Sequence, residues 1–200
     1  MTVSDGHDGR FDKNQKMKEV AILCKLNHRN LIKLHDYFVE DGNIYIITEY
    51  CMKGDLSQYM STAICLPKHR IWKIIIEVTL ALAYLHQSGI IHCDLKPQNI
   101  FISGESRVKV GDLSSAIMGS SKNHFSLNCG TPCYTAPEIY NKESYDSKVD
   151  IWSLGCIIYE LCTNRRAFDS TSFETLKAKV TEGKAPLITF PPANLKMSLY

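Results

Sequence analysis

The stretch that decides the fold is GIIHCDLKPQNIF, residues 89–101. It places His92, Asp94, Lys96 and Asn99 between two apolar runs, in the pattern H-x-D-L-x-x-x-N. Taken alone, this pattern also fits a loop between a helix and a strand, in which Asp94 and Asn99 are ordinary turn residues. Its interpretation therefore depends on the motifs that follow it along the chain.

Further motifs follow in order: G-D-L-S at 111–114, G-T-P at 130–132, A-P-E at 136–138 and D-I-W-S-L-G-C at 150–156. Each is weak by itself. Together with residues 89–101 they resemble the eukaryotic protein kinases, over about residues 13–184. The segments GTPCYTAPEIY (130–140) and SKVDIWSLGCIIYELCTNRRAF (147–168) are most similar to the NIMA-related Ser/Thr kinases.

The resemblance implies an α+β, protein-kinase-like fold with an incomplete small N-lobe, of one helix and two strands, and a mostly α-helical C-lobe. Residues 1–51 are predicted to be the partial N-lobe and hinge, and residues 52–200 the C-lobe, truncated after a helix at 172–181. Sequence patterns predict further helices at 13–26, 55–59, 68–87 and 148–162, and strands at 31–39, 43–51, 100–102 and 108–110. The strand at 43–51 is apolar on both faces, which predicts burial, and residues 112–138 are predicted to be a long loop.

Composition argues against several classes of function. The chain is 44% hydrophobic and 22% charged, as in globular proteins, and its net charge of +2 without a basic block argues against nucleic-acid binding. The polar N-terminus predicts no secretory signal, and the longest apolar run, residues 74–85, carries Glu77 and is too short to span a membrane. The eight Cys show no CxxC motif, so we expect reduced thiols in a cytoplasmic protein, with nuclear or cytoskeletal association left open.

The resemblance implies ATP and Mg²⁺ as cofactors and a protein Ser or Thr hydroxyl as the acceptor. Phosphoryl transfer depends on positioning and on charge neutralisation. Asp94 is the candidate carboxylate that faces the hydroxyl, and Lys96 is the candidate cation beside the transferred group. Asn99 and Asp112 would supply the hard oxygen ligands that Mg²⁺ prefers. Thr131 is expected to hydrogen-bond toward Asp94 and Lys96.

On the nucleotide side, the resemblance makes residues 48–51 the hinge. Glu49 and Cys51 would meet an adenine edge through their backbone groups. Asp55 either reaches the ribose or caps the short helix that follows it.

The resemblance also implies structural roles. Asp150 is expected to be a buried carboxylate that accepts hydrogen bonds from the backbone near His92. An internal spine of Leu34, Leu23, Leu113 and His92 is expected to stand on Asp150.

Two departures from the family lie outside residues 89–101. No glycine-rich loop or V-A-I-K lysine precedes Glu19, so this residue is expected to lack its partner and to be a solvated helix residue. We therefore expect a chain that starts after the strands that bind the phosphates of ATP in the resembling family. The Arg that normally pairs with Glu138 is also missing, with Arg165 and Arg166 as weak candidates.

Two substitutions lie close to the catalytic residues. Ser114 replaces the family's Gly, which predicts backbone strain and restricted switching of this loop. Cys93 replaces an Arg that usually clamps a phosphorylated residue, so ordering of the loop through this position should be weak. The candidate phosphorylation sites are Ser120, Ser121 and Ser126.

The sequence thus favours a Ser/Thr protein kinase, in a truncated form with weak activity. The alternative is a pseudokinase fragment that acts as a protein-binding module for a partner kinase or scaffold, but the intact Asp94, Asn99 and Asp112 argue against long decay of the site. A small-molecule phosphotransferase shares the H-x-D…N loop. Residues 136–138 and 150–155 disfavour it, because in the resembling family they build a platform for protein substrates.

Overall fold

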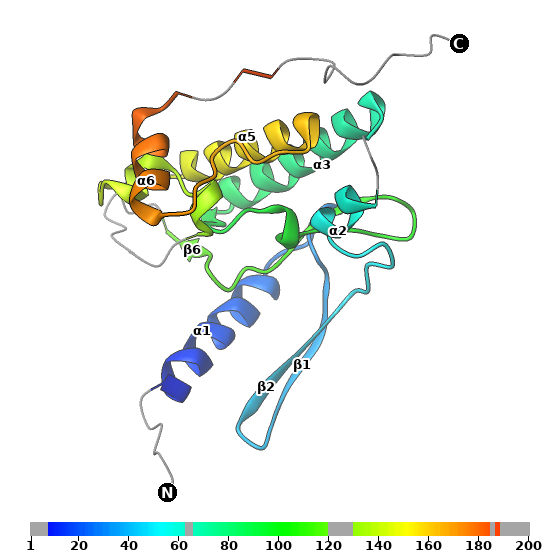
Figure 1. The fold of residues 1–200 in the computed structure, drawn as a ribbon. Coiled ribbons are helices and arrows are strands. Elements are labelled where there is room, and N and C mark those ends of the chain that lie inside the picture. The colour runs from blue at the N-terminus through cyan, green and yellow to red at the C-terminus, as the bar shows by residue number, and fades with distance from the viewer. Residues whose placement is uncertain (1–7, 63–65, 120–129, 185–186, 189–200) are drawn as a thin grey trace, which may run out of the picture.

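The computed structural model describes residues 8–62, 66–119, 130–184 and 187–188 (Figure 1). The helices are α1 (Asp8–Leu23), α2 (Leu56–Ser61), α3 (Lys68–Gln87), α4 (Pro137–Tyr140), α5 (Lys148–Thr163) and α6 (Phe173–Glu182). The strands are β1 (Leu34–Glu40), β2 (Asn43–Thr48), β3 (Ile90–Ile91), β4 (Ile100–Ile102), β5 (Val108–Val110) and β6 (Ile117–Met118). Two 3-10 turns are η1 (Pro97–Asn99) and η2 (Pro132–Tyr134). Every predicted helix and strand is present. α3, β4 and β5 have the predicted bounds, and the ends of the others are shifted, most of all those of α1.

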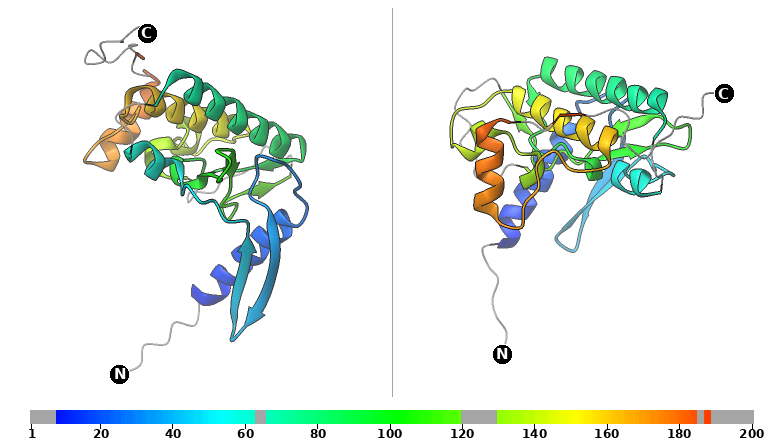
Figure 2. Two further views of the ribbon diagram at one scale, coloured as in Figure 1. Left: turned by 90° about the vertical axis from the view of Figure 1, so that its right-hand side faces the viewer. Right: turned by 45° about the horizontal axis from the view of Figure 1, so that its top comes forward.

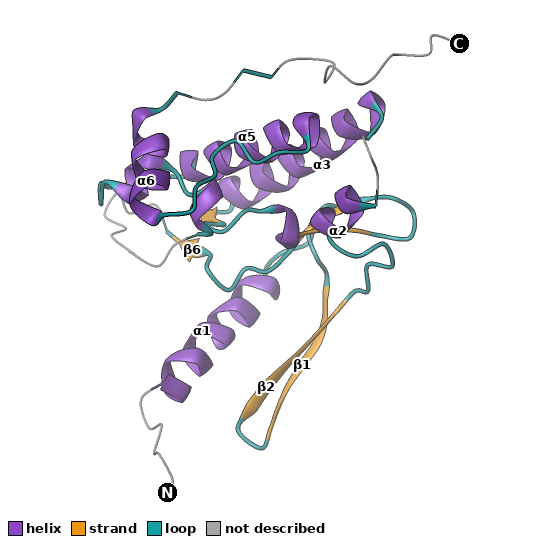
Figure 3. Cartoon of the chain, in the orientation of Figure 1, coloured by secondary structure: helices purple, strands orange, loops and turns teal. Residues whose placement is uncertain are grey.

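The elements separate into two regions. α1 and the long β1–β2 hairpin lie at one end of the molecule, and α3, α5 and α6 gather at the other (Figure 3). Both turned views keep this separation (Figure 2). The arrangement agrees with the predicted α+β fold, whereas the domain boundary at residue 51 stays a prediction. Within the described ranges, no helix combines the length and apolar character needed to cross a membrane.

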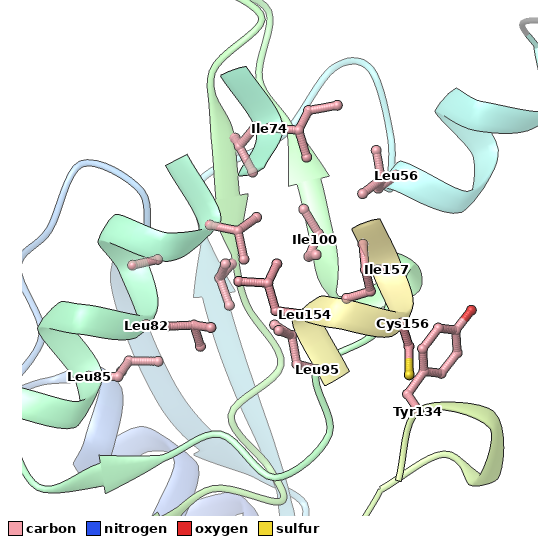
Figure 4. Packing of buried hydrophobic residues seen from close by; sticks show 14 of the residues in the cluster. Leu56, Ile74, Leu82, Leu85, Leu95, Ile100, Tyr134, Leu154, Cys156 and Ile157 are labelled. Atoms are coloured by element: carbon pink, nitrogen blue, oxygen red, sulfur yellow. The ribbon is translucent and has the colours of Figure 1, made fainter. Parts of the chain in front are cut away.

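The hydrophobic core lies in the helical region, around α3 and α5. Ile74, Leu82 and Leu85 of α3 and Ile157 of α5 are buried. Figure 4 shows these side chains converging with Ile100 of β4. Full burial of one such side chain stabilises the fold by about 1.5–3 kcal/mol, so the loop between β3 and β4 rests on a firmly packed base.

Three antiparallel pairs of strands complete the fold. β1 pairs with β2 across a turn at Asp41 and Gly42, whose φ angles are 49° and 79°, as a tight hairpin turn requires. β4 pairs with β5, as the sequence predicted. β3 pairs with β6 through Ile91 and Ile117. The loop predicted at 112–138 therefore contains a strand; η2 also lies in it, and α4 begins at its end.

The prediction that residues 43–51 form a buried strand is wrong. β2 alternates between exposed and half-buried residues at its start and ends exposed, and β1 is exposed over most of its length. Phe38 and Tyr45 stack with ring centroids 4.8 Å apart, yet they remain 42% and 43% exposed. In the part of the chain that the structure describes, no third strand pairs with β1 or β2. The hairpin therefore has too little cover to bury both faces.

A buried ion pair fastens the predicted hinge to β5. Lys109 is only 8% exposed, and its Nζ donates to Glu49 Oε1 at 2.7 Å and to the Leu31 carbonyl at 3.4 Å. The same Glu49 oxygen accepts the Lys33 N–H at 2.8 Å. Glu49 thus links three separate segments of the chain at one carboxylate.

Replacing Lys109 by Met should lower the free energy of unfolding by about 2 kcal/mol, because the Glu49 carboxylate would lose its buried counter-charge. The Glu49 side chain is 21% exposed, which keeps the loss below that of a fully buried pair. The double variant Glu49→Met, Lys109→Met should recover most of the stability, since no buried charge remains. Urea unfolding of the three proteins measures the effect, and a single variant as stable as wild type would contradict it.

Candidate active site

Three polar side chains meet at the loop that follows β3. Lys96 Nζ donates to Asp94 Oδ2 at 2.7 Å and to Thr131 Oγ1 at 2.8 Å. Thr131 Oγ1 in turn donates to Asp94 Oδ1 at 2.9 Å. The hydrogen bonds expected of Thr131 are therefore present. Both carboxylate oxygens of Asp94 are engaged, which fixes the direction of the carboxylate.

Gly130 allows Thr131 to come this close to Asp94. Its φ of +91° is one that L side chains rarely adopt. A Cβ at this position would lie 2.9 Å from Thr135 Oγ1 and 3.2 Å from the Cys93 carbonyl. Glycine is thus required by both backbone conformation and space.

Asn99 and Asp112 flank Asp94 with different surroundings. Asn99 is 4% exposed, and its Nδ2 donates to the Asp94 carbonyl at 2.8 Å and to Asp94 Oδ2 at 3.2 Å. Because its amide nitrogen is committed, the Asn99 Oδ1 is the atom that could ligate a cation. Asp112 is exposed and has a left-handed backbone, with φ 55°, which Asp tolerates better than most residues.

A buried carboxylate beneath the loop fixes its backbone. Asp150 of α5 is 0% exposed. Its two oxygens accept the N–H groups of His92 and Cys93, each at 2.9 Å, and Oδ2 also lies 2.7 Å from His86 Nε2. This is the arrangement expected of Asp150. His92 is itself buried, and its Nε2 lies 3.1 Å from the Gly111 carbonyl, so Asp150 and His92 together join α5, the loop that follows β3 and the end of β5.

The other members of the expected spine belong to the same packed region. Leu23 and Leu113 are buried in the main hydrophobic cluster, and Leu34 is partly buried against it. The three leucines of the expected spine therefore belong to one apolar cluster.

A cavity of 510 Å³ lies between the hairpin region and the helical region. Its lining consists of Glu19, Leu23, Ile32, Ile46, Thr48, Glu49, Tyr50, Cys51, Gly54, Asp55, Gln58, Phe101 and Asp112. The sequence predicted the hinge, Asp55 and Asp112 for this side of the site, and the structure brings them together here. Asp94, Lys96 and Asn99 do not line the cavity; they lie in the loop described above.

Two backbone groups of the predicted hinge are engaged within the chain, which indicates which groups of Glu49 and Cys51 remain for a ligand. The Glu49 N–H donates to the Lys33 carbonyl at 3.0 Å, so the Glu49 carbonyl is the group that could accept from a ligand. The Cys51 carbonyl accepts the Gly54 N–H at 3.1 Å, so the Cys51 N–H is the group that could donate. Asp55 caps α2: its Oδ1 accepts the Gln58 N–H at 2.8 Å. This favours the capping alternative for Asp55, although the residue also lines the cavity.

The expectation that Glu19 could be a solvated helix residue is wrong. Its Oε1 accepts the Leu113 N–H at 3.2 Å, and the residue lines the cavity beside Asp112. Burial, and then the charge of Asp112, raise the pKa of the Glu19 carboxyl above its usual value. Helix α1 is therefore anchored to the turn that carries Asp112.

The strain expected at Ser114 is not found, whereas the expectation for Cys93 stays a prediction. The left-handed residue of the turn is Asp112 rather than Ser114, so the strain predicted at Ser114 is absent. Cys93 is buried with φ 66°. Arg166 Nη1 lies 3.7 Å from Asp169 and 3.7 Å from Cys133 Sγ, which places it with those residues instead of as a partner for Glu138. The candidate phosphorylation sites fall outside the described residues.

Sequence reasoning missed several of the cavity residues, Phe101 and Gln58 among them. Phe101 lies between the buried Ile100 and Ile102 on β4, and side chains of a strand alternate in direction. This period of two could have placed Phe101 on the cavity side. Gln58 lies three residues after Asp55, but nothing in the pattern of α2 marks it as a cavity residue.

Comparisons with known proteins indicate the same family as the sequence motifs. A family model described as "Protein kinase domain" matches residues 2–196. Serine/threonine-protein kinase Nek1 of Mus musculus is 34% identical over 92% of the chain and 15% of its own length. Nek3 of Mus musculus is 36% identical over 87% of the chain and 35% of its own length. Nek11 of Homo sapiens is 37% identical over 89% of the chain and 29% of its own length. The chain thus spans 15% to 35% of the length of these relatives.

Proposed function

Since this chain belongs to the protein kinase family, we propose that it transfers the γ-phosphoryl group of ATP to Ser or Thr hydroxyls of proteins. Its relatives include the Ser/Thr kinases Nek1, Nek3 and Nek11, in agreement with the predicted similarity to NIMA-related kinases. The observation that carries the proposal is the set of hydrogen bonds that fixes Asp94 between Lys96 and Thr131. Such a fixed carboxylate is what positioning of an acceptor hydroxyl requires.

In this proposal each residue of the loop has a separate task. Asp94 orients the acceptor hydroxyl and takes up its proton. Lys96 Nζ has three N–H donors, of which one goes to Asp94 and one to Thr131. The third can meet an oxygen of the transferred group. Thr131 holds the other oxygen of Asp94, so the carboxylate cannot rotate away from the acceptor.

The cavity and its surroundings fit a nucleotide and magnesium. Its 510 Å³ falls within the roughly 300–1,000 Å³ of small-molecule sites. The Glu49 carbonyl and the Cys51 N–H would bind the adenine edge, and Asn99 Oδ1 with an Asp112 carboxylate oxygen would hold Mg²⁺. When bound, Mg²⁺ would neutralise the negative charge of the phosphates.

The direct test is transfer from γ-labelled ATP with Mg²⁺ to casein by the purified protein. Label should appear on Ser and Thr and not on Tyr. A preparation that binds nucleotide but leaves all three residue types unlabelled would contradict the proposal.

Magnesium-dependent binding should depend on Asp112. Mg·ATP should raise the melting temperature of the wild-type protein, and Asp112→Asn should remove the magnesium-dependent part of the rise, because a neutral amide is a much poorer ligand. Asn is the suitable replacement, since it tolerates the left-handed backbone of this position. The measurement is a thermal melt with ATP in the presence and absence of EDTA. An unchanged magnesium-dependent rise in the melting temperature of the variant would contradict the assignment of Asp112 as a Mg²⁺ ligand.

The exposed apolar side chains favour a second candidate, a module that binds a partner kinase or scaffold. Trp72, Ile76 and Leu80 follow one another at four-residue steps on α3 and are 54%, 54% and 47% exposed. Residues four apart lie on one face of a helix, so they form a short apolar stripe. Phosphorylation of casein would favour the enzyme over this alternative.

A further inference from the structure

The hydroxyl of Ser114 is bonded to the carboxylate that would hold magnesium. Ser114 Oγ donates to Asp112 Oδ1 at 2.7 Å. The Ser114 N–H points to the same oxygen at 3.4 Å. Oδ1 of Asp112 therefore receives two hydrogen bonds from Ser114. Ser114 stands in place of the family's Gly, which has no hydroxyl to donate.

The turn that carries this contact is held from two sides. Glu19 Oε1 accepts the Leu113 N–H at 3.2 Å, which fixes the backbone between Asp112 and Ser114. The Ser114 hydroxyl fixes the Asp112 side chain itself. A carboxylate oxygen has about two lone-pair sites, and the hydroxyl and N–H of Ser114 are directed at those of Oδ1. A cation at Oδ1 would therefore have to displace a donor of Ser114.

The number of divalent cations that the proposed site can hold depends on how many carboxylate oxygens are available to bind them. Protein kinases can hold two Mg²⁺ ions with one Asp and one Asn, so the Asp has to serve both ions. A hydrogen bond to an ionised carboxylate is among the stronger ones, and the two donors at Oδ1 leave no lone-pair site of that oxygen open to a cation. Asn99 contributes only one oxygen, because a side-chain amide has a single carbonyl oxygen, and its Nδ2 donates to Asp94.

We propose that Ser114 occupies Oδ1 of Asp112 and so restricts this site to one divalent cation, bound through Oδ2. Ser114 is then a positioning residue that sets the metal stoichiometry of the site. The inference rests on the proposed nucleotide and magnesium binding. It adds that Ser114 determines the number of divalent cations bound.

The test is a titration of the protein with Mn²⁺ in the presence of an equimolar, non-hydrolysable ATP analogue, with free Mn²⁺ followed by electron paramagnetic resonance. The wild-type protein should bind one Mn²⁺ per chain, and Ser114→Ala should bind two. Ser114→Thr keeps the hydroxyl and should bind one. Ser115→Ala, a change of the neighbouring serine, is the matched control and should also bind one.

Three results would overturn the inference alone: two Mn²⁺ ions in the wild type, one in Ser114→Ala, or two in Ser114→Thr. The variant Asp112→Asn separates these results from failure of the proposed function. If the wild type binds Mn²⁺ no better than Asp112→Asn, the metal assignment and the inference fall together. If Asp112→Asn loses Mn²⁺ but the Ser114 variants match the wild type, only the inference falls.

Discussion

Replacing Asp94 by Asn should lower the rate of phosphoryl transfer roughly 10³-fold, within the range attributed to a positioned general base. The amide has nearly the size of the carboxylate, but it cannot take up the acceptor's proton. It also places an N–H₂ group against either Lys96 Nζ or Thr131 Oγ1, which now lie at 2.7 and 2.9 Å from the two carboxylate oxygens. The loss should therefore appear in kcat at saturating ATP, and nucleotide binding should persist.

The matched control is Asp41→Asn, in the β1–β2 turn. Asp41 is exposed and has φ 49°, a conformation that Asn adopts readily. It should transfer phosphate at the wild-type rate. Both variants should keep the nucleotide-dependent rise in melting temperature. Transfer by Asp94→Asn within tenfold of wild type would show that another group takes the proton.

Replacing Asp150 by Asn should lower the free energy of unfolding by about 3 kcal/mol, because a buried acceptor of two backbone N–H groups becomes a side chain with one acceptor oxygen. The N–H of His92 or of Cys93 would then face an amide N–H₂. For a 200-residue chain this corresponds to a fall in melting temperature of roughly 10 °C.

Glu143→Gln is the control for this loss, because Glu143 is an exposed carboxylate of the same region. It should leave the melting temperature within about 1 °C, as surface substitutions usually do. Equal melting curves for wild type and Asp150→Asn would mean that Asp150 does not support the loop.

The parts of the site that could be predicted are those that local spacing fixes. Asp94, Lys96 and Asn99 fall within six residues, and the single segment between β3 and β4, which includes η1, brings them together. The short strands on either side of Gly104 were predictable for the same reason. Sequence similarity added Thr131 and Asp150, whose contacts with the loop the structure shows.

What could not be predicted depends on contacts between distant segments. Glu19 meets the Leu113 N–H across 94 residues, and Lys109 meets Glu49 across 60. No local pattern marks either pair. The exposure of β2 is another example: its apolar residues fit a buried strand, but burial depends on whether a further layer covers the sheet.

The support that Asp150 gives has a consequence for protein engineering. The loop at 89–101 carries the recognisable residues, yet the acceptor that gathers its His92 and Cys93 N–H groups lies on α5, 58 residues beyond His92. Grafting the loop alone onto another scaffold would transfer its sequence, but not the backbone conformation that Asp150 stabilises. The smallest portable unit is the loop together with a buried carboxylate presented from a helix beneath it.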